Sequence, residues 1–397
     1  MEVTMSDSNV VIAGAARTPM GSMMGSLEAV RSPDLGATSI RAAIERSGLA
    51  PADVQAVIMG CVLPGGLGQA PARQASRASE IPDSAGCTTV NKMCGSGMQA
   101  VILAHDQIRA GTADLMVAGG MENMSQAPYL LPRARRGMRM GHGQVLDSMF
   151  LDGLEDAYQG ELMGVFAQQS ADNGGITRER MDDFAIQSLE RANAAIEHGW
   201  FEPEISPVTV SGRRGDTLVD TDEQPGNARP DRIPGLKPAF TRDGSVTAAN
   251  ASSISDGASA LVLASAAEAG ARGLTVQARI VAHATHARLP EEFTLAPIGA
   301  VEKVLEKTGW HRDDVDLFEI NEAFAAVSLL AIDALGLDEQ KVNVYGGACA
   351  LGHPIGSSGS RILVTLMNAL QQKGLRRGVA ALCIGGGEAT AVAIELA

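Results

Sequence analysis

Two segments near the two ends of the chain repeat the same order of features. Residues 90–123 and 342–390 each begin like a strand and turn through several glycines. Each then continues as an apolar helix that ends at a glycine, followed by an apolar strand and further glycines. A repeated order of elements indicates that one α/β unit has been duplicated within the chain. This duplication constrains the fold more than any other feature.

Strands and helices alternate through the first 120 residues. Ser32 as N-cap, Pro33 at the first helical position and Gly48 as a stop delimit one of the helices. Such alternation predicts a mostly parallel sheet covered by helices on both faces. The predicted strands are 9–16, 54–62 and 113–120, and the predicted helices are 32–48, 70–80 and the apolar run after Cys94.

The pattern changes in the middle of the chain. Residues 121–245 are polar and rich in glycine and proline, with one clear helix at 178–199. We interpret them as an inserted loop domain. The predicted organisation is an N-terminal half (1–120, completed by 246–273), the inserted domain (121–245) and a C-terminal half (274–397).

Composition excludes several classes of protein. The chain of 397 residues is 45% hydrophobic and 20% charged, as is typical of globular proteins, and its net charge of −14 repels nucleic acid and anionic membranes. No apolar run reaches the roughly 18 residues that span a bilayer, and no export signal precedes the first strand, so we expect a cytoplasmic protein. An arginine-rich stretch is interpreted as a solvated loop, with phosphate binding as the alternative: Arg133, Arg135, Arg136 and Arg139.

The five cysteines are odd in number and contain no CxxC pair, which argues against disulfides and a metal site. Cys94 stands just before an apolar helix, between a polar turn and Gly95 and Gly97. Amides at a helix N-terminus favour a thiolate. A nucleophile and an ordinary buried cysteine are equally good interpretations of this stretch alone.

Three further stretches add polar groups. His353 lies in a loop with five glycines that we expect to press against a ligand, and it is a candidate base for a nearby thiol. Cys383 ends an apolar strand and precedes Gly385, whose amide is a candidate oxyanion donor. Asn321 and Glu322 open a predicted helix, either as a structural pair or as site residues that hold a water.

In this order, five motifs resemble those of the thiolases over nearly the whole chain: NKMCGSGMQA, GGMENMSQAPYL, NEAFAA, GGACALGHPIG and CIGGG. The resemblance implies a five-layered αβαβα fold of two βαβαβαββ halves with an inserted loop domain. It also implies an acetyl-CoA C-acetyltransferase, which condenses two acetyl-CoA to acetoacetyl-CoA and CoA. A broader-chain 3-ketoacyl-CoA thiolase is the alternative.

By the same resemblance, Cys94 is the acylated nucleophile, His353 activates it, and Cys383 is the acid/base. His353 and a water on Asn321 form one oxyanion hole, and the amides of Cys94 and Gly385 form the other. The residues matched to coenzyme A binding are Leu154, Met163, Arg229, Ala248, Ser252 and Phe324.

The resemblance implies no metal or organic cofactor, because coenzyme A thioesters are substrates, and it implies a homotetramer built as a dimer of dimers. Leu189 stands where one branch of the family has a potassium-binding tyrosine, which leaves potassium dependence open. A decarboxylating condensing enzyme and a non-catalytic acyl-CoA binding protein are alternatives from other classes.

Overall fold

Ten strands form one continuous sheet in this computed structural model, which describes residues 9–213 and 215–397. Residues 1–8, part of the stretch in which we found no export signal, lie outside the described residues. The short strand β2 (Gly21–Ser22) pairs with β10 at the side of the main path. That path runs β12 (Leu317–Ile320), β13 (Arg377–Ile384), β14 (Glu388–Leu396), β11 (Ala278–Ala287), β1 (Val10–Arg17), β10 (Ser255–Ser265), β5 (Leu115–Asn123), β3 (Ala56–Gly60) and β4 (Gly86–Val90).

The sheet is mixed, so the prediction of a mostly parallel sheet is wrong. Only β3–β4, β3–β5 and β12–β13 pair in parallel. The central pairs β1–β10, β1–β11, β10–β5, β11–β14 and β13–β14 are antiparallel. Strand–helix alternation detects the parallel crossovers. It does not detect direct returns such as the tight β13–β14 turn, which can join only antiparallel strands.

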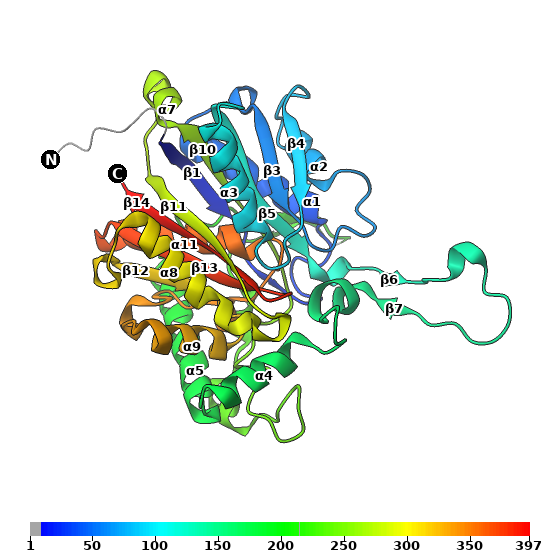
Figure 1. The fold of residues 1–397 in the computed structure, drawn as a ribbon. Coiled ribbons are helices and arrows are strands. Elements are labelled where there is room, and N and C mark those ends of the chain that lie inside the picture. Colours follow the sequence, from blue (N-terminus) through cyan, green and yellow to red (C-terminus); the bar gives the residue numbers. More distant parts are fainter. Residues whose placement is uncertain (1–8, 214) are drawn as a thin grey trace.

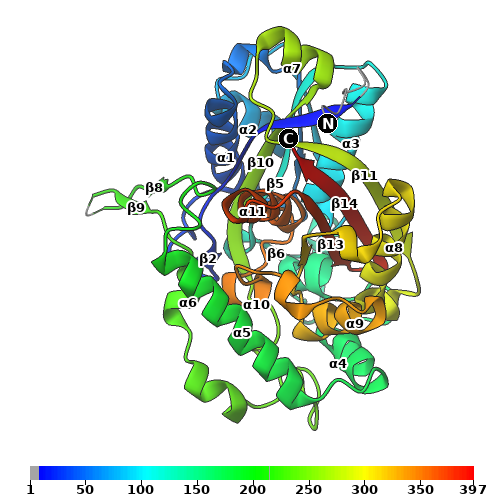
Figure 2. The ribbon, with the colours of Figure 1, turned by 90° about the vertical axis from the view of Figure 1, so that its left-hand side faces the viewer.

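The predicted duplication is confirmed by the order of the strands. The run β1–β10–β5–β3 in the N-terminal half matches β11–β14–β13–β12 in the C-terminal half. Helix α1 (Ser32–Ser47) contacts the first run and α8 (Ala296–Thr308) the second, each on an outer face. Helices α3 (Ser96–Arg109) and α11 (Ser358–Lys373) lie between the two runs, where α11 contacts both β10 and β13 (Figure 2). This is the expected five-layered arrangement.

The N-cap of α1 lies one residue before the predicted one. Arg31 occupies the N-cap position, and the Ser32 hydroxyl accepts a hydrogen bond of 2.8 Å from the Asn123 N–H instead. Gly48 ends the helix in the left-handed conformation, as predicted. No helix within the described residues is both long enough and apolar enough to cross a membrane.

The middle of the chain contains more regular structure than its composition indicates. Strand β5 continues to Asn123, three residues past the predicted domain boundary at residue 120. The division of the chain into domains stays a prediction. The expected helix is α5 (Arg178–Glu197). The segment also holds α4 (Met163–Asn173), α6 (Glu223–Asn227) and the pairs β6–β7 (Tyr129–Leu130 with Leu146–Asp147) and β8–β9 (Val208–Val210 with Thr217–Val219). The remaining helices are α2 (Pro71–Ala78), α7 (Ala266–Arg272), α9 (Ala325–Leu335) and α10 (Ala348–Leu351).

The pair β6–β7 and its connecting loop form an arm that stands away from the body of the protein (Figure 1). We call residues 129–147 the arm. Its loop carries the arginine-rich stretch, whose side chains are all exposed. The arm also exposes large apolar side chains: Tyr129, Leu131, Met138, Met140 and Val145.

The helices α3 and α11 approach closely at their N-terminal ends, and glycines permit this. A Cβ added to Gly97 would lie 2.5 Å from the Ser360 Oγ, and one added to Gly359 would lie 2.5 Å from the Met98 backbone nitrogen. Side chains at these positions would push the helices apart. The residues just before the two helices are therefore held near each other at the centre of the molecule.

We predict that Gly97→Ala lowers stability by about 1–3 kcal/mol, because the added methyl overpacks this helix contact. Gly270→Ala is the matched control: it also lies in a helix, but a Cβ there would meet nothing within 4 Å. That change should be neutral or stabilising. Urea unfolding of both variants measures the difference, and equal stabilities would contradict the tight contact.

Candidate active site

A cavity of about 360 Å³ lies where the two helices begin. It is bounded by the ends of β13 and α4 and by loops from both halves of the chain. Nine of the eleven predicted site residues line it: Cys94, Leu154, Met163, Ala248, Ser252, Phe324, His353, Cys383 and Gly385. Side chains far apart in the sequence therefore meet in one apolar chamber.

Cys94 lies two residues before α3 and is partly exposed. A turn holds it in place, in which the Gly95 N–H donates to the Lys92 carbonyl oxygen at 3.0 Å. Desolvation raises the pKa of its thiol to about 11, although the N–H groups of Gly385 and of Cys94 itself favour the thiolate. Our expectation that the helix N-terminus lowers this pKa is wrong, because desolvation outweighs the amides. The thiol therefore needs a base.

His353 is buried between α10 and α11. The Ser358 hydroxyl lies 2.5 Å from its Nδ1 and donates to the Pro354 carbonyl oxygen at 3.0 Å. Because the hydroxyl hydrogen is used there, Ser358 accepts from Nδ1–H, and Nε2 keeps its lone pair. Nε2 has no hydrogen-bond partner among the residues described. Burial, followed by the charge of Arg361, lowers the pKa of His353 to about 3, so the resting ring is neutral and its Nε2 is unprotonated.

The glycines around His353 press against protein, so our expectation that they press against a ligand is wrong. A Cβ on Gly356 would lie 2.6 Å from the Glu122 Oε2, and a Cβ on Gly347 would overlap the Glu322 carboxylate. Gly385 differs, since its nearest neighbour would be Met163 at 3.9 Å. Gly385, in the turn after β13, therefore opens onto the cavity.

Cys383 is buried at the end of β13. Burial raises the pKa of its thiol well above the usual range, and the neighbouring Cys94 raises it further. The turn that follows it needs glycine, because Gly386 and Gly387 have φ of 92° and 88°. That turn brings the Gly385 N–H to the sulfur of Cys94.

Asn321 and Glu322 follow β12 in a loop, and α9 begins only at Ala325, so the prediction that they open a helix is wrong. Glu322 is a structural carboxylate that accepts from the Ser188 hydroxyl at 2.7 Å and the Asn343 amide at 2.8 Å. Asn321 is buried outside the cavity lining, and neither its amide nitrogen nor its oxygen has a partner in the described chain. Its amide is therefore free to hold a polar group.

The walls of the cavity also include Phe240, Phe293 and Ala323, which the sequence did not indicate. The Ser252 N–H donates to the Ala323 carbonyl oxygen at 3.0 Å and so joins two loops from different halves. Phe324 packs edge-to-face against Phe240 and Phe293, with ring centroids 5.8 and 6.2 Å away. Isolated phenylalanines such as Phe240 and Phe293 carry no periodic signal, and Ser358, the first residue of α11, is one of several neighbouring serines. Arg229 is exposed and lies outside the cavity.

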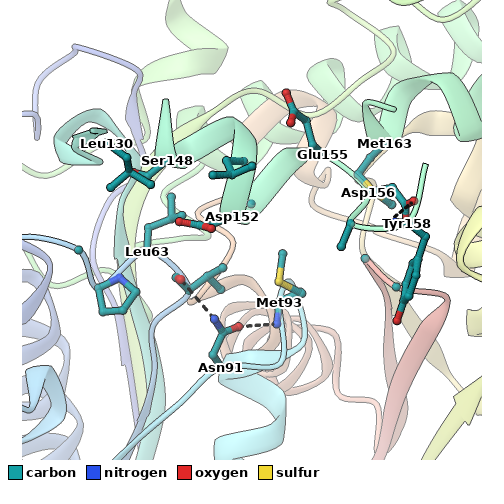
Figure 3. A pocket seen from close by; sticks show the side chains of 18 residues that line it. Leu63, Asn91, Met93, Leu130, Ser148, Asp152, Glu155, Asp156, Tyr158 and Met163 are labelled. Atoms are coloured by element: carbon teal, nitrogen blue, oxygen red, sulfur yellow. Dashed lines mark hydrogen bonds between the residues drawn. The ribbon is translucent and has the colours of Figure 1, made fainter. Parts of the chain in front are cut away.

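A second cavity of about 570 Å³ adjoins the first and shares Gly153, Met163 and Gly385 with it. Figure 3 looks into this cavity, where Leu63, Met93 and Leu130 provide apolar surface. Carboxylates also line it, namely Asp152, Glu155 and Asp156. Space beside the thiol site therefore extends into this second cavity.

Comparison with known proteins agrees with this architecture. Residues 10–267 match the thiolase N-terminal domain and residues 274–396 match the thiolase C-terminal domain. The chain belongs to the thiolase family.

Among similar proteins, acetyl-CoA acetyltransferase of Pseudomonas aeruginosa is 49% identical over 97% of this chain and 99% of its own. Acetyl-CoA acetyltransferase 2 of Arabidopsis thaliana is 49% identical over 98% and 97% of the two chains. The crystal structure of the Bacillus anthracis acetyl-CoA acetyltransferase superposes with a TM-score of 0.96 at 41% identity and covers 98% of this chain and 99% of that one.

We predict that Cys94 reacts slowly with iodoacetamide at neutral pH. Only the thiolate is alkylated, so with a pKa of about 11 the rate should rise about tenfold per pH unit between about pH 7 and pH 10. An unstructured cysteine peptide, with a pKa of about 8.5, should level off near pH 9. Peptide mass mapping resolves the cysteines, and a plateau for Cys94 below pH 9 would show that desolvation does not dominate.

Proposed function

We propose that this protein is an acetyl-CoA C-acetyltransferase, which reversibly condenses two acetyl-CoA to acetoacetyl-CoA and CoA. One observation carries the proposal: two thiols, a neutral imidazole with a free nitrogen, and a backbone N–H aimed at one thiol share a single narrow cavity. Acyl transfer followed by carbon–carbon bond formation needs these groups together. The two acetyl-CoA acetyltransferase relatives, nearly half identical over almost the whole chain, also support it.

In the first half-reaction, Cys94 attacks the thioester carbonyl of acetyl-CoA while His353 Nε2 takes the thiol proton. The N–H groups of Cys94 and Gly385, which already favour negative charge on the sulfur, receive the tetrahedral oxyanion. One such donor is worth about 3–4 kcal/mol in comparable sites. The carbon–sulfur bond to CoA breaks, and the departing thiolate takes the proton of Cys383. The products are acetyl-Cys94, an imidazolium and a Cys383 thiolate.

In the second half-reaction, Cys383 removes a proton from the methyl group of a second acetyl-CoA. A C–H beside a thioester is weakly acidic, and the raised pKa of Cys383 makes its thiolate a correspondingly strong base. The enolate oxygen is stabilised by His353 Nε2–H and by a water held on the unpaired amide of Asn321. The carbanion attacks acetyl-Cys94, and the released Cys94 thiolate recovers its proton from His353.

This assignment also gives Ser358 a positioning role. A hydroxyl that accepts from Nδ1–H stabilises the imidazolium formed when Nε2 takes the Cys94 proton. It also keeps the ring from rotating between the two half-reactions.

We propose that the channel of the pantetheine arm is lined by Leu154, Met163, Ala248, Ser252 and Phe324. Arg229 is the proposed adenine-binding residue. No metal or organic cofactor takes part in the proposed reaction.

A broader-chain 3-ketoacyl-CoA thiolase is the second candidate, and the adjoining cavity favours it. That cavity has apolar surface from Leu63, Met93 and Leu130 and meets the thiol site at Gly153 and Met163. A longer acyl chain on Cys94 would have room there. The chemistry at the three catalytic side chains is the same in both candidates.

We predict that acetoacetyl-CoA, supplied without free CoA, leaves an acetyl group on Cys94, detected by peptide mass mapping. A thiolase cleaves the substrate between its second and third carbons and keeps the shortened acyl group. Adducts from longer 3-ketoacyl-CoAs at similar rates would favour the second candidate. No adduct on Cys94 with any substrate would contradict the assignment. Cys383→Ala, which keeps Cys94 and His353, should abolish thiolysis, whereas a non-catalytic binding protein would be unaffected.

We further propose a cytoplasmic homotetramer built as a dimer of dimers. Five free cysteines support a reducing compartment. The arm supports assembly, because it stands away from the body of the protein and exposes Tyr129, Leu131 and Met140. The chain is proposed to divide into two thiolase halves (1–120 with 246–273, and 274–397) and the inserted domain 121–245.

We predict that replacing the arm loop 131–145 by a short glycine turn reduces the assembly from a tetramer to a dimer, because the loop's apolar side chains lose their partners. Light scattering coupled to gel filtration measures the mass. The catalytic cavity lies away from this loop, so turnover should remain. An unchanged mass would show that the arm does not hold the tetramer together.

A further inference from the structure

A second group of polar side chains lies outside the active site, between α3 and β11. His105 and Asp106 are near the C-terminal end of α3, and His283 lies on β11. The Asp106 Oδ1 is 2.9 Å from the His105 Nδ1 and 2.9 Å from the His283 Nε2. One ligand-type atom from each residue lies within 4.8 Å of the other two.

The surroundings hold two of these side chains and leave the third open to solvent. The His105 side chain is 7% exposed and the His283 side chain 21%, and the two rings pack edge-to-face with centroids 4.9 Å apart. The Asp106 side chain is 53% exposed. The cluster is therefore fixed on the protein side and accessible from water on the other.

The Asp106 carboxylate supplies the negative charge of the cluster. Burial lowers the pKa of His105, so its imidazole is neutral near pH 7. Burial opposes ionisation of Asp106, but the hydrogen bonds of the two imidazoles outweigh it and lower the pKa of the carboxyl. The ring nitrogens that face Asp106 would present their lone pairs to a bound ion, which would replace both hydrogen bonds to the carboxylate.

We propose that His105, Asp106 and His283 bind a divalent first-row transition metal ion of the zinc type, with solvent completing its coordination. Bonds of about 2.0–2.1 Å to nitrogen and oxygen place neighbouring ligands of one ion about 2.9–3.4 Å apart. Both Asp–His distances of 2.9 Å lie at the start of that range. A ligand set of two imidazoles and one carboxylate binds zinc, nickel and copper ions more strongly than magnesium or calcium ions.

Two nearby cations limit the affinity of this site. Arg109 lies one turn further along α3 and contributes to the lowered pKa of His105. The Lys307 Nζ donates to the His283 carbonyl oxygen at 2.8 Å. A bound ion would be repelled by both charges. We therefore expect weaker binding than at a closed four-ligand zinc site.

A bound ion would join the two halves of the duplicated fold. Its ligands come from α3, the helix that follows Cys94, and from β11, the first strand of the C-terminal half. An ion that binds only the folded chain raises the apparent stability with its concentration. The site does not touch the catalytic cavity, so this inference does not depend on the proposed reaction.

Isothermal titration calorimetry with Zn²⁺ tests the proposal on the full chain after chelator treatment. A Cys94→Ser background reduces competition from the catalytic thiols. His283→Ala should weaken binding at least tenfold. His311→Ala is the matched control, because His311 Nδ1 lies 3.2 Å from Asp313 Oδ2 in an exposed pair without a third ligand, and its loss should leave Zn²⁺ affinity unchanged.

Asp106→Asn provides a second variant, which keeps the size of a half-exposed side chain and removes its charge. It should also weaken binding at least tenfold, and Zn²⁺ should raise the melting temperature of the Cys94→Ser parent but not of this variant. Equal Zn²⁺ affinity in the parent, His283→Ala and Asp106→Asn proteins would overturn the proposal. No binding by the parent would overturn it as well, and the cluster would then be a hydrogen-bonded triad only.

Discussion

The close contact between α3 and α11 decides the geometry of the candidate active site. Gly97 and Gly359 let the two helices approach at their N-terminal ends, where any side chain would force them apart. Cys94 precedes one helix and His353 precedes the other. A contact between backbones thereby brings a thiol and an imidazole from opposite halves of the chain to one cavity. The duplicated fold matters for function because it places two such helices back to back.

Desolvation sets the chemistry of that cavity more strongly than the helix amides do. The Cys94 pKa is raised and the His353 pKa is lowered, so the resting pair is a thiol and a neutral imidazole. Desolvation therefore disfavours both the Cys94 thiolate and the His353 imidazolium in the resting site. In the proposed reaction, negative charge forms on a substrate oxygen that the N–H groups of Cys94 and Gly385 stabilise. In the proposed reaction the same dry surroundings make the Cys383 thiolate a strong base. Reactive charges would then appear only when both thioester and donors are in place.

Much of the fold could be predicted from particular stretches of sequence. The duplicated pattern predicted the two halves, and Gly48 marked the end of α1 as the structure has it. The antiparallel centre of the sheet could not be predicted, because a strand's apolar pattern does not reveal its partner. The candidate site was predicted at Cys94, His353, Cys383 and Gly385, where residues with distinctive chemistry stand beside turns. Ser358, Phe240 and the adjoining cavity were missed because their neighbours come from distant segments.

The sequence by itself determined which residues carry reactive groups and which elements they follow, since these depend on local order along the chain. Only the tertiary structure decided the environment of each group. It gave Glu322 its hydrogen-bond partners, left Asn321 without any in the described chain, and packed most of the glycines around His353 against protein. It also brought His283 to Asp106 across 177 residues and so beside His105, whereas the spacing of the cysteines had argued against a structural zinc site. Burial and proximity arise only when distant segments pack, and they set the pKa values on which the chemistry depends.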